Sequence, residues 1–171
     1  LPYFRRMESF AGGDPHWRGD CGPLTISRVR ERPTLSEAFI DAAEQAGFAR
    51  NPDYNAASQD GFGYYQVTQK NGRRLSVADS YLRAAARRPN LVIVTHALAL
   101  SIALGDDRAR SVTIRRGGST RILRARREII LAAGAVQSPQ LLELSGIGDP
   151  ARLSALGIET RVAAPEVGEN Y

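Results

Sequence analysis

The stretch Gly134–Gly148, with the sequence GAVQSPQLLELSGIG, constrains the fold of this chain more than any other segment. The apolar run Glu128–Ala133 before it is typical of a buried strand, and Ala133 and Gly134 form a turn of small residues. An apolar helical run, 138–144, follows that turn. Small residues let backbone amides approach a phosphate or an adenine ring, and the start of a helix attracts anions. This order of elements predicts an α/β fold, and it leaves open whether the turn binds a cofactor.

The region 76–171 is regularly patterned and predicts the second half of a dinucleotide-binding fold. A helix is indicated first, then a short buried parallel strand, because the apolar positions change from helical spacing to a continuous run. Three strands separated by Gly- or Asp-bearing turns predict an antiparallel meander. Near the end, Asp149-Pro150 suits a helix N-cap followed by proline. The expected helices are Val77–Arg87, Ser138–Leu144 and Pro150–Leu156, and the expected strands are Leu91–Val94, Ala97–Leu104, Val112–Arg115, Arg121–Ala125 and Glu128–Ala133.

The region 1–75 is less regular, because Gly and Pro interrupt it repeatedly. Strands are indicated at Leu24–Ser27 and Gly61–Val67. Between them, Ser36–Ala46 has apolar residues at helical spacing and ends before Gly47, a typical C-terminal cap. The change in patterning divides the chain into residues 1–75 and 76–171.

The net charge of +5 raises nucleic acid as a partner, a hypothesis that rests on charge alone. Arginines crowd between Arg108 and Arg127, but aromatic residues for base stacking are not interleaved with them. We therefore interpret this segment as a solvated face of the meander and predict no nucleic-acid partner. The apolar runs are also too short to cross a bilayer, so no transmembrane segment is expected.

Few features of the sequence indicate that side chains of this chain take part in catalysis or metal binding. One cysteine, Cys21, and two distant histidines, His16 and His96, provide no zinc-binding set, and no metal is predicted. Cys21 has an acidic neighbour, which disfavours a reactive thiolate. We interpret both histidines as structural or surface residues. No catalytic residue is therefore predicted within the chain.

The stretch Gly134–Gly148 resembles the second signature of the glucose–methanol–choline oxidoreductases, which are FAD-dependent enzymes that oxidise alcohols. The resemblance extends over essentially all 171 residues and is strongest for choline-dehydrogenase-like members. The motifs that carry it, in family order, are GDPHWRG at 13–19, GPL at 22–24, DYN at 53–55, GFG at 61–63, NGRR at 71–74, SYL at 80–82, RPNL at 88–91 and PEVGEN at 165–170.

The resemblance implies a mixed α/β fold, namely a partial Rossmann-like FAD-binding domain with a β-meander and part of the substrate-cap region. Residues 1–75 would belong to the cap region and its connecting loops, and residues 76–171 to the FAD-binding domain. By match to family positions, the backbone of Ala99 would contact the adenine of FAD. Ala133 and Gly134 would lie near its diphosphate and ribose. Gly168, Glu169 and Asn170 lead, in relatives, toward the flavin.

Two family motifs have no counterpart in the chain: the GxGxxG unit that holds the diphosphate and the catalytic histidine. The chain is therefore interpreted as an internal fragment that is inactive alone and binds FAD weakly or not at all. A non-catalytic binding or structural module with half of the fold is the alternative. The resemblance further implies a small alcohol as substrate, oxygen or a quinone as electron acceptor, and a cytoplasmic location, either free or peripheral to the inner membrane.

Overall fold

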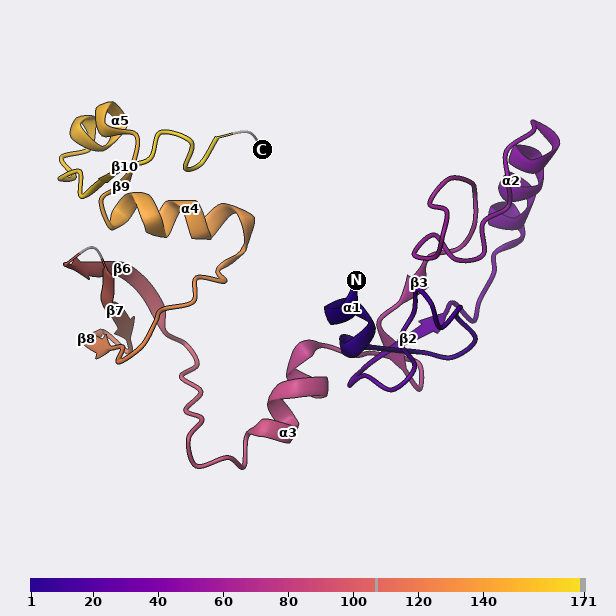
Figure 1. Ribbon diagram of the computed structural model, residues 1–171, viewed down its shortest axis with the longest axis horizontal. Coiled ribbons are helices and arrows are strands. Elements are labelled where there is room, and N and C mark those ends of the chain that lie inside the picture. The colour runs from indigo at the N-terminus through magenta and orange to yellow at the C-terminus, as the bar shows by residue number, and fades with distance from the viewer. Residues whose placement is uncertain (107, 170–171) are drawn as a thin grey trace. The chain divides into compact units, whose positions relative to one another are not determined.

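The computed structural model describes residues 1–106 and 108–169 of the chain (Figure 1). Contacts divide the chain into two compact units, Leu1–Ile93 and Val94–Tyr171. Helices and strands occur in both units, so the mixed α/β class predicted from the sequence is confirmed. Because each unit has its own contacts, we describe each by itself.

The first unit is organised around a small three-stranded sheet in the order β1-β2-β3. β1 pairs with β2 in parallel, and β2 pairs with β3 antiparallel. Phe10 at the end of β1 and Leu24 at the start of β2 are buried and form part of the core. The predicted strand at Leu24–Ser27 is thus confirmed. The elements are α1 (Pro2–Met7), β1 (Glu8–Phe10), β2 (Leu24–Arg28), β3 (Gln66–Val67), β4 (Gln69–Lys70) and β5 (Arg73–Arg74).

The helix α2 (Thr34–Gln45) confirms the prediction made for Ser36–Ala46. Ile40 and Ala43 are buried on one face. The helix ends in a Schellman motif, because the amide of Gly47 donates to the carbonyl of Glu44 and the next amide donates to the carbonyl of Ala43. Gly47 has a φ of 92°, which a residue without a side chain adopts at little cost. The C-terminal cap expected at Gly47 is therefore present.

The helix expected at Val77–Arg87 is formed by a π-helical turn, η1 (Ala78–Leu82), followed by α3 (Arg83–Ala85). Its start is capped reciprocally. The amide of Asp79 donates to the hydroxyl of Ser76 at 3.3 Å, and the amide of Ser76 donates to the carboxylate of Asp79 at 3.4 Å. The hydroxyl of Ser76 also donates to that carboxylate, at 2.8 Å. The bond from Ser76 lowers the pKa of Asp79. The capping box thus fixes the first turn of this helix.

The second unit contains the predicted meander, in which β6, β7 and β8 pair antiparallel in sequence order. Ile102 of β6 and Ile114 of β7 are buried. After the meander, α4 packs on β6. The short strands β9 and β10, which precede and follow α5 in the sequence, pair in parallel. The elements are β6 (Leu98–Gly105), β7 (Arg108–Arg116), β8 (Ser119–Arg124), α4 (Gly134–Leu144), β9 (Ile147–Gly148), α5 (Pro150–Ala155) and β10 (Val162–Ala163).

The start of α5 confirms the cap expected at Asp149-Pro150. The carboxylate of Asp149 accepts a hydrogen bond from the amide of Ala151 at 3.0 Å. Proline at the first helical position loses no hydrogen bond there. Leu153 in the middle of this helix is fully buried, so the short helix is fixed by packing as well as by its cap.

Two predicted strands are wrong. Leu91–Val94 and Glu128–Ala133 contain no strand, and no described residue pairs with them. Val92 and Ile130 are each 81% exposed, whereas buried strands were expected. The apolar residues were identified correctly, but a strand requires a hydrogen-bonded neighbour, and the described part of the chain provides none for either segment.

Candidate functional site

The first candidate site lies at the start of α4, where Ala133 and Gly134 were expected to approach the cofactor. The amide of Ala133 donates to the hydroxyl of Ser138 at 3.1 Å, so the serine of the Ser-Pro pair fixes the turn. Gly134 has a φ of 91°, and apart from its chain neighbours and the backbone of its own helix no atom lies within 4 Å of the position that a side chain would occupy. The turn therefore presents backbone and open space at the positive end of an 11-residue helix.

The far end of α4 is attached to the meander by Ser145. Its hydroxyl accepts a hydrogen bond from the amide of Ile102 at 2.8 Å and donates to the carbonyl of Leu141 at 2.6 Å. Ile102 belongs to β6, an edge strand of the three-stranded sheet. One side chain therefore satisfies a carbonyl of its own helix and a strand amide that lies 43 residues earlier in the chain than Ser145.

The glycines after Ser145 allow close packing against a segment further along the chain. A side chain at Gly146 would approach the carbonyl oxygen of Glu159 to 2.5 Å, which is too close for any residue but glycine. The carbonyl of Gly146 accepts hydrogen bonds from the amides of Arg161 and Val162. The Ser-Gly-Ile-Gly end of the signature thus allows β10 to pair closely with β9.

A second attachment of α4 involves Arg152 of α5. Its guanidinium donates to the carboxylate of Glu143 at 2.9 Å and also to that of Glu169. These bonds raise the pKa of Arg152, and the bond to Glu169 contributes most. They hold the Gly168-Glu169 turn near α4, whereas Asn170 of the same motif lies outside the described residues.

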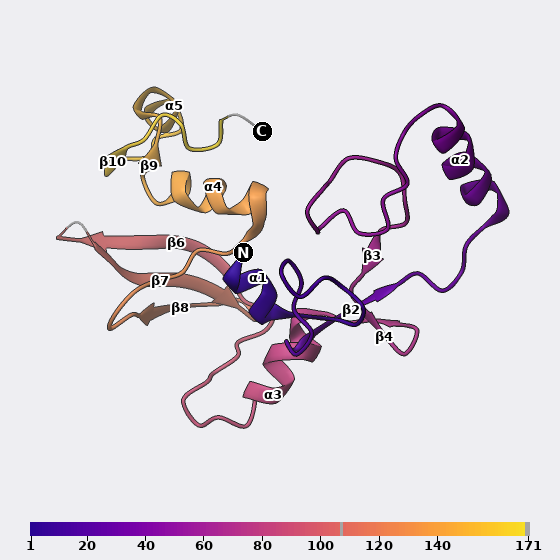
Figure 2. The ribbon, with the colours of Figure 1, turned by 45° about the vertical axis from the view of Figure 1, so that its right-hand side comes forward.

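The structure places Ala99 at the second position of β6, paired with Ile114 and exposed at its side chain. The helix α4 packs on β6, and the two elements start at the same end of this unit in Figure 2. A cavity of ≈ 300 Å³ between the two elements is lined by other residues, among them Leu144 and Ser145. The assignment of Ala99, Ala133 and Gly134 to the cofactor stays a prediction.

The leucines of the signature differ in their surroundings. Leu141 is buried, as expected for a core residue. Leu144, by contrast, is 50% exposed. Leu144 instead lines, with residues of β6, the cavity of ≈ 300 Å³ described above.

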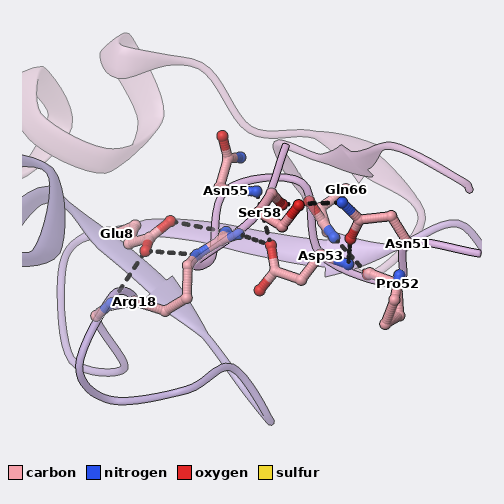
Figure 3. Close-up of polar contacts among 9 residues, drawn as sticks. Glu8, Arg18, Asn51, Pro52, Asp53, Asn55, Ser58 and Gln66 are labelled. Atoms are coloured by element: carbon pink, nitrogen blue, oxygen red, sulfur yellow. Dashed lines mark hydrogen bonds and ion pairs between the residues drawn. The ribbon is translucent and has the colours of Figure 1, made fainter. Parts of the chain in front are cut away.

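In the first unit, sequence analysis missed a buried charged cluster around Arg18 (Figure 3). Arg18 is only 4% exposed, and it forms two parallel bonds with the carboxylate of Glu8, at 2.8 and 2.9 Å. A third nitrogen donates to Asp53 at 2.5 Å. The guanidinium also lies 4.4 Å from the ring centroid of Phe10. A planar guanidinium suits this combination of bidentate and ring contacts, which lysine could not make.

The cluster continues into the loop that carries Asp53. The side chain of Asn51 accepts from the amide of Asp53 and donates to the carbonyls of Ser58 and Asp60. Figure 3 shows Asn51, Asp53 and Gln66 along one side of this loop. The sequence signal was present in the GDPHWRG and DYN motifs, but 35 residues separate Arg18 from Asp53, so spacing alone could not pair them.

The remaining residues considered for catalysis or metal binding are His16, His96 and Cys21. His16 lies against Trp17, and His96 is exposed with a φ of 55°. Cys21 is a free, exposed thiol. Across residues 1–106 and 108–169, no three His, Cys, Asp or Glu side chains are grouped as metal ligands, and no helix is long and apolar enough to cross a membrane.

The model of the GMC oxidoreductases, N-terminal part, matches residues 1–171. The chain belongs to the GMC oxidoreductase family. It is 46% identical over 170 residues to an oxygen-dependent choline dehydrogenase of Sinorhizobium medicae, and 48% identical to one of Brucella anthropi. The match covers 99% of this chain and 31% of each relative, so the chain spans about a third of their length.

Solved structures agree with the family assignment. Pyridoxine 4-oxidase from "Mesorbium loti" superposes with a TM-score of 0.90 at 31% identity, over 97% of this chain and 33% of that enzyme. A formate oxidase from Aspergillus oryzae superposes with a TM-score of 0.86 at 26% identity, over 99% of this chain and 31% of that enzyme. The family resemblance stated from the sequence is therefore confirmed.

The role of Ser145 can be tested by replacing it with alanine in the full-length protein. The amide of Ile102 would lose its acceptor, so we expect a loss of about 1–3 kcal/mol in the free energy of local opening. Hydrogen exchange at that amide measures the loss directly. Ser154→Ala is the matched control, because Ser154 is an exposed serine of α5 with no side-chain bond among the described residues. Equal protection of the Ile102 amide in both variants would refute the proposed bridge.

The charged cluster predicts that Arg18→Ala is severely destabilising. Glu8 and Asp53 would keep their charges in a largely buried setting without a partner, at a cost of about 3–5 kcal/mol. Thermal unfolding of the full-length protein measures this cost. Arg87→Ala, which removes an exposed arginine without an ion pair among the described residues, should change stability by less than about 0.5 kcal/mol. A similar small effect for Arg18→Ala would contradict this interpretation.

Proposed function

We propose that this chain forms part of an FAD-dependent alcohol oxidoreductase of the choline-dehydrogenase type. The observation that carries the proposal is the identity of about 46% to choline dehydrogenases over nearly the whole chain. The substrate would be a small primary alcohol, with choline as the first compound to test. FAD, when bound, would accept a hydride from the alcohol, and oxygen or a quinone would reoxidise it.

The residues of the second unit fit a dinucleotide. Ala133 and Gly134 present backbone and open space at a helix start, which suits a diphosphate. Ala99 lies on an exposed edge strand, where backbone groups are accessible to an adenine ring. We assign these three residues to the cofactor and none to catalysis. No nucleic-acid partner is proposed.

We further propose that residues 1–75 belong to the substrate-cap region and residues 76–171 to the FAD-binding domain. The main support is the order of the family motifs along the chain. A cytoplasmic location, free or peripheral to the inner membrane, is proposed on the same resemblance. In this scheme the chain orients the cofactor, while the base that takes the hydroxyl proton lies outside residues 1–171.

The 171-residue chain alone should be colourless and inactive. His16 and His96 do not match the catalytic position, and the chain has no GxGxxG unit for the diphosphate. Expression of residues 1–171, followed by flavin absorbance and a choline oxidation assay, tests this expectation. A yellow protein with tightly bound flavin would overturn it and favour an independent binding module.

The cofactor assignment is tested in the full-length protein by Gly134→Ala. A methyl group at this turn would occupy the space assigned to the diphosphate, so we expect FAD affinity to fall about tenfold, or about 1.4 kcal/mol. Gly157→Ala is a matched control, because Gly157 also has a positive φ and open space around it. Flavin content per protein gives the readout. If both variants retain flavin equally, Gly134 does not contact the cofactor.

A further inference from the structure

The first unit contains a hollow of ≈ 540 Å³ beside the hairpin formed by β4 and β5 (Figure 2). Residues of η1 and α3 line its other side, and the proposed oxidoreductase function assigns it no role. Its volume lies within the range of about 300–1,000 Å³ typical of sites for small molecules. The charged residues that line it are Lys70, Arg73, Arg74, Asp79 and Arg83.

Within the hairpin, two positive side chains lie directly opposite each other. Asn71 and Gly72 both have a positive φ, 52° and 77°, as is typical of a two-residue hairpin turn. The turn places Lys70 of β4 opposite Arg73 of β5. Side chains of directly opposite residues share one face, with their Cβ atoms about 5 Å apart, and like charges in such a pair are destabilising. A negative charge beside this pair would offset the repulsion.

The hairpin carries three cations, Lys70, Arg73 and Arg74, which are exposed and form no ion pair among the described residues. Asp79 is the one carboxylate among the described residues that line the hollow. It already accepts from the hydroxyl of Ser76 at 2.8 Å and from the guanidinium of Arg83 at 2.6 Å, and the bond from Ser76 lowers its pKa. The described part of the chain therefore offers the hairpin no free carboxylate.

The arrangement of these three cations favours an anion with several charges and with acceptor oxygens in several directions. A monovalent anion would offset their charge only in part. Lys70 and Arg73 share one face of the hairpin, whereas Arg74 lies one position further, opposite Gln69. A carboxylate presents two oxygens in one plane, whereas a phosphate group presents them around a tetrahedron. Lysine and arginine are the usual side chains that bind phosphate.

We propose that this hollow binds a ligand with two neighbouring phosphate groups. One phosphate group would accept from Lys70 and Arg73 and remove their mutual repulsion. The other would accept from Arg74. A soluble diphosphate and the headgroup of a phospholipid share this chemistry, and the experiments below distinguish them.

The probe for the test is inorganic pyrophosphate, titrated into the full-length, FAD-loaded protein at low and constant ionic strength. The bound cofactor occupies its own diphosphate site, so calorimetry then measures binding elsewhere. Citrate, which has a similar charge at neutral pH but only carboxylates, is the comparison. We expect pyrophosphate to bind at least about fivefold tighter than citrate. No binding of pyrophosphate, or equal affinity for citrate, would overturn the proposal.

Two variants of the hairpin, Arg73→Gln and Arg74→Gln, locate the binding. Each removes one positive charge, so each should weaken binding of pyrophosphate about tenfold. In the absence of ligand, only Arg73→Gln relieves the repulsion with Lys70, because Arg74 lies opposite the neutral Gln69. We therefore expect Arg73→Gln, and not Arg74→Gln, to raise the melting temperature of the ligand-free protein, by about 1 °C. Arg5→Gln, which removes an exposed arginine of α1 without an ion pair among the described residues, is the control.

Unchanged affinity in both hairpin variants, or an equal loss in Arg5→Gln, would show that pyrophosphate binds elsewhere or through net charge alone, and would refute the site. A lower melting temperature of ligand-free Arg73→Gln would also refute it, because Arg73 would then have a partner within the protein.

Vesicles that contain cardiolipin, a phospholipid with two phosphate groups, identify the source of the phosphates. If they displace pyrophosphate, the site binds a lipid headgroup; if they do not, it binds a soluble diphosphate. Both results support the site. None of these measurements depends on alcohol oxidation, so this proposal can fail while the proposed oxidoreductase function stands, and the reverse also holds.

Discussion

The hydrogen bond between the hydroxyl of Ser145 and the amide of Ile102 determines how the second unit is built. The helix α4 packs on β6, and this bond adds a specific polar contact to that packing. With it, the C-terminal end of α4 is fixed to one residue of the edge strand. The other end of this 11-residue helix is the small-residue turn at Ala133 and Gly134. The bond at Ser145 therefore contributes to where the candidate cofactor contacts lie, from the opposite end of the helix.

In the first unit the main constraint is that a buried charge needs oppositely charged partners. Arg18 is buried only because Glu8 and Asp53 surround it, and each carboxylate comes from a different part of the unit. Removing one partner leaves a buried charge, so the three groups act as a set. The same loop carries Asn51, whose side-chain amide bonds to Ser58 and Asp53 hold the loop in shape. Order in this irregular unit thus comes from polar contacts more than from regular structure.

The sequence predicted those elements whose causes are local. The meander, the helix at Ser36–Ala46 with its glycine cap, and the helix after Asp149 depend on periodicity, turns and caps within a few residues. The strands expected at Leu91–Val94 and Glu128–Ala133 were wrong, since pairing is a property of a neighbour and not of the segment itself. In the candidate sites, too, residues with a local role were predicted, and residues that act through a distant partner were not.

Within the candidate sites, the sequence located the turn at Ala133 and Gly134 by its small residues. Ser145 was noticed only as part of a pattern, because its partner lies 43 residues earlier in the chain. The cluster of Arg18 was missed altogether, although Arg18 and Asp53 stand in quoted motifs. A motif consists of residues that are close in sequence. Ser145 and Arg18, by contrast, join segments that are distant in sequence. In this chain, Ser145 joins α4 to β6, and Gly146 allows the segment at Arg161 and Val162 to pack closely, so these two residues of the signature have a structural role whether or not a cofactor binds nearby.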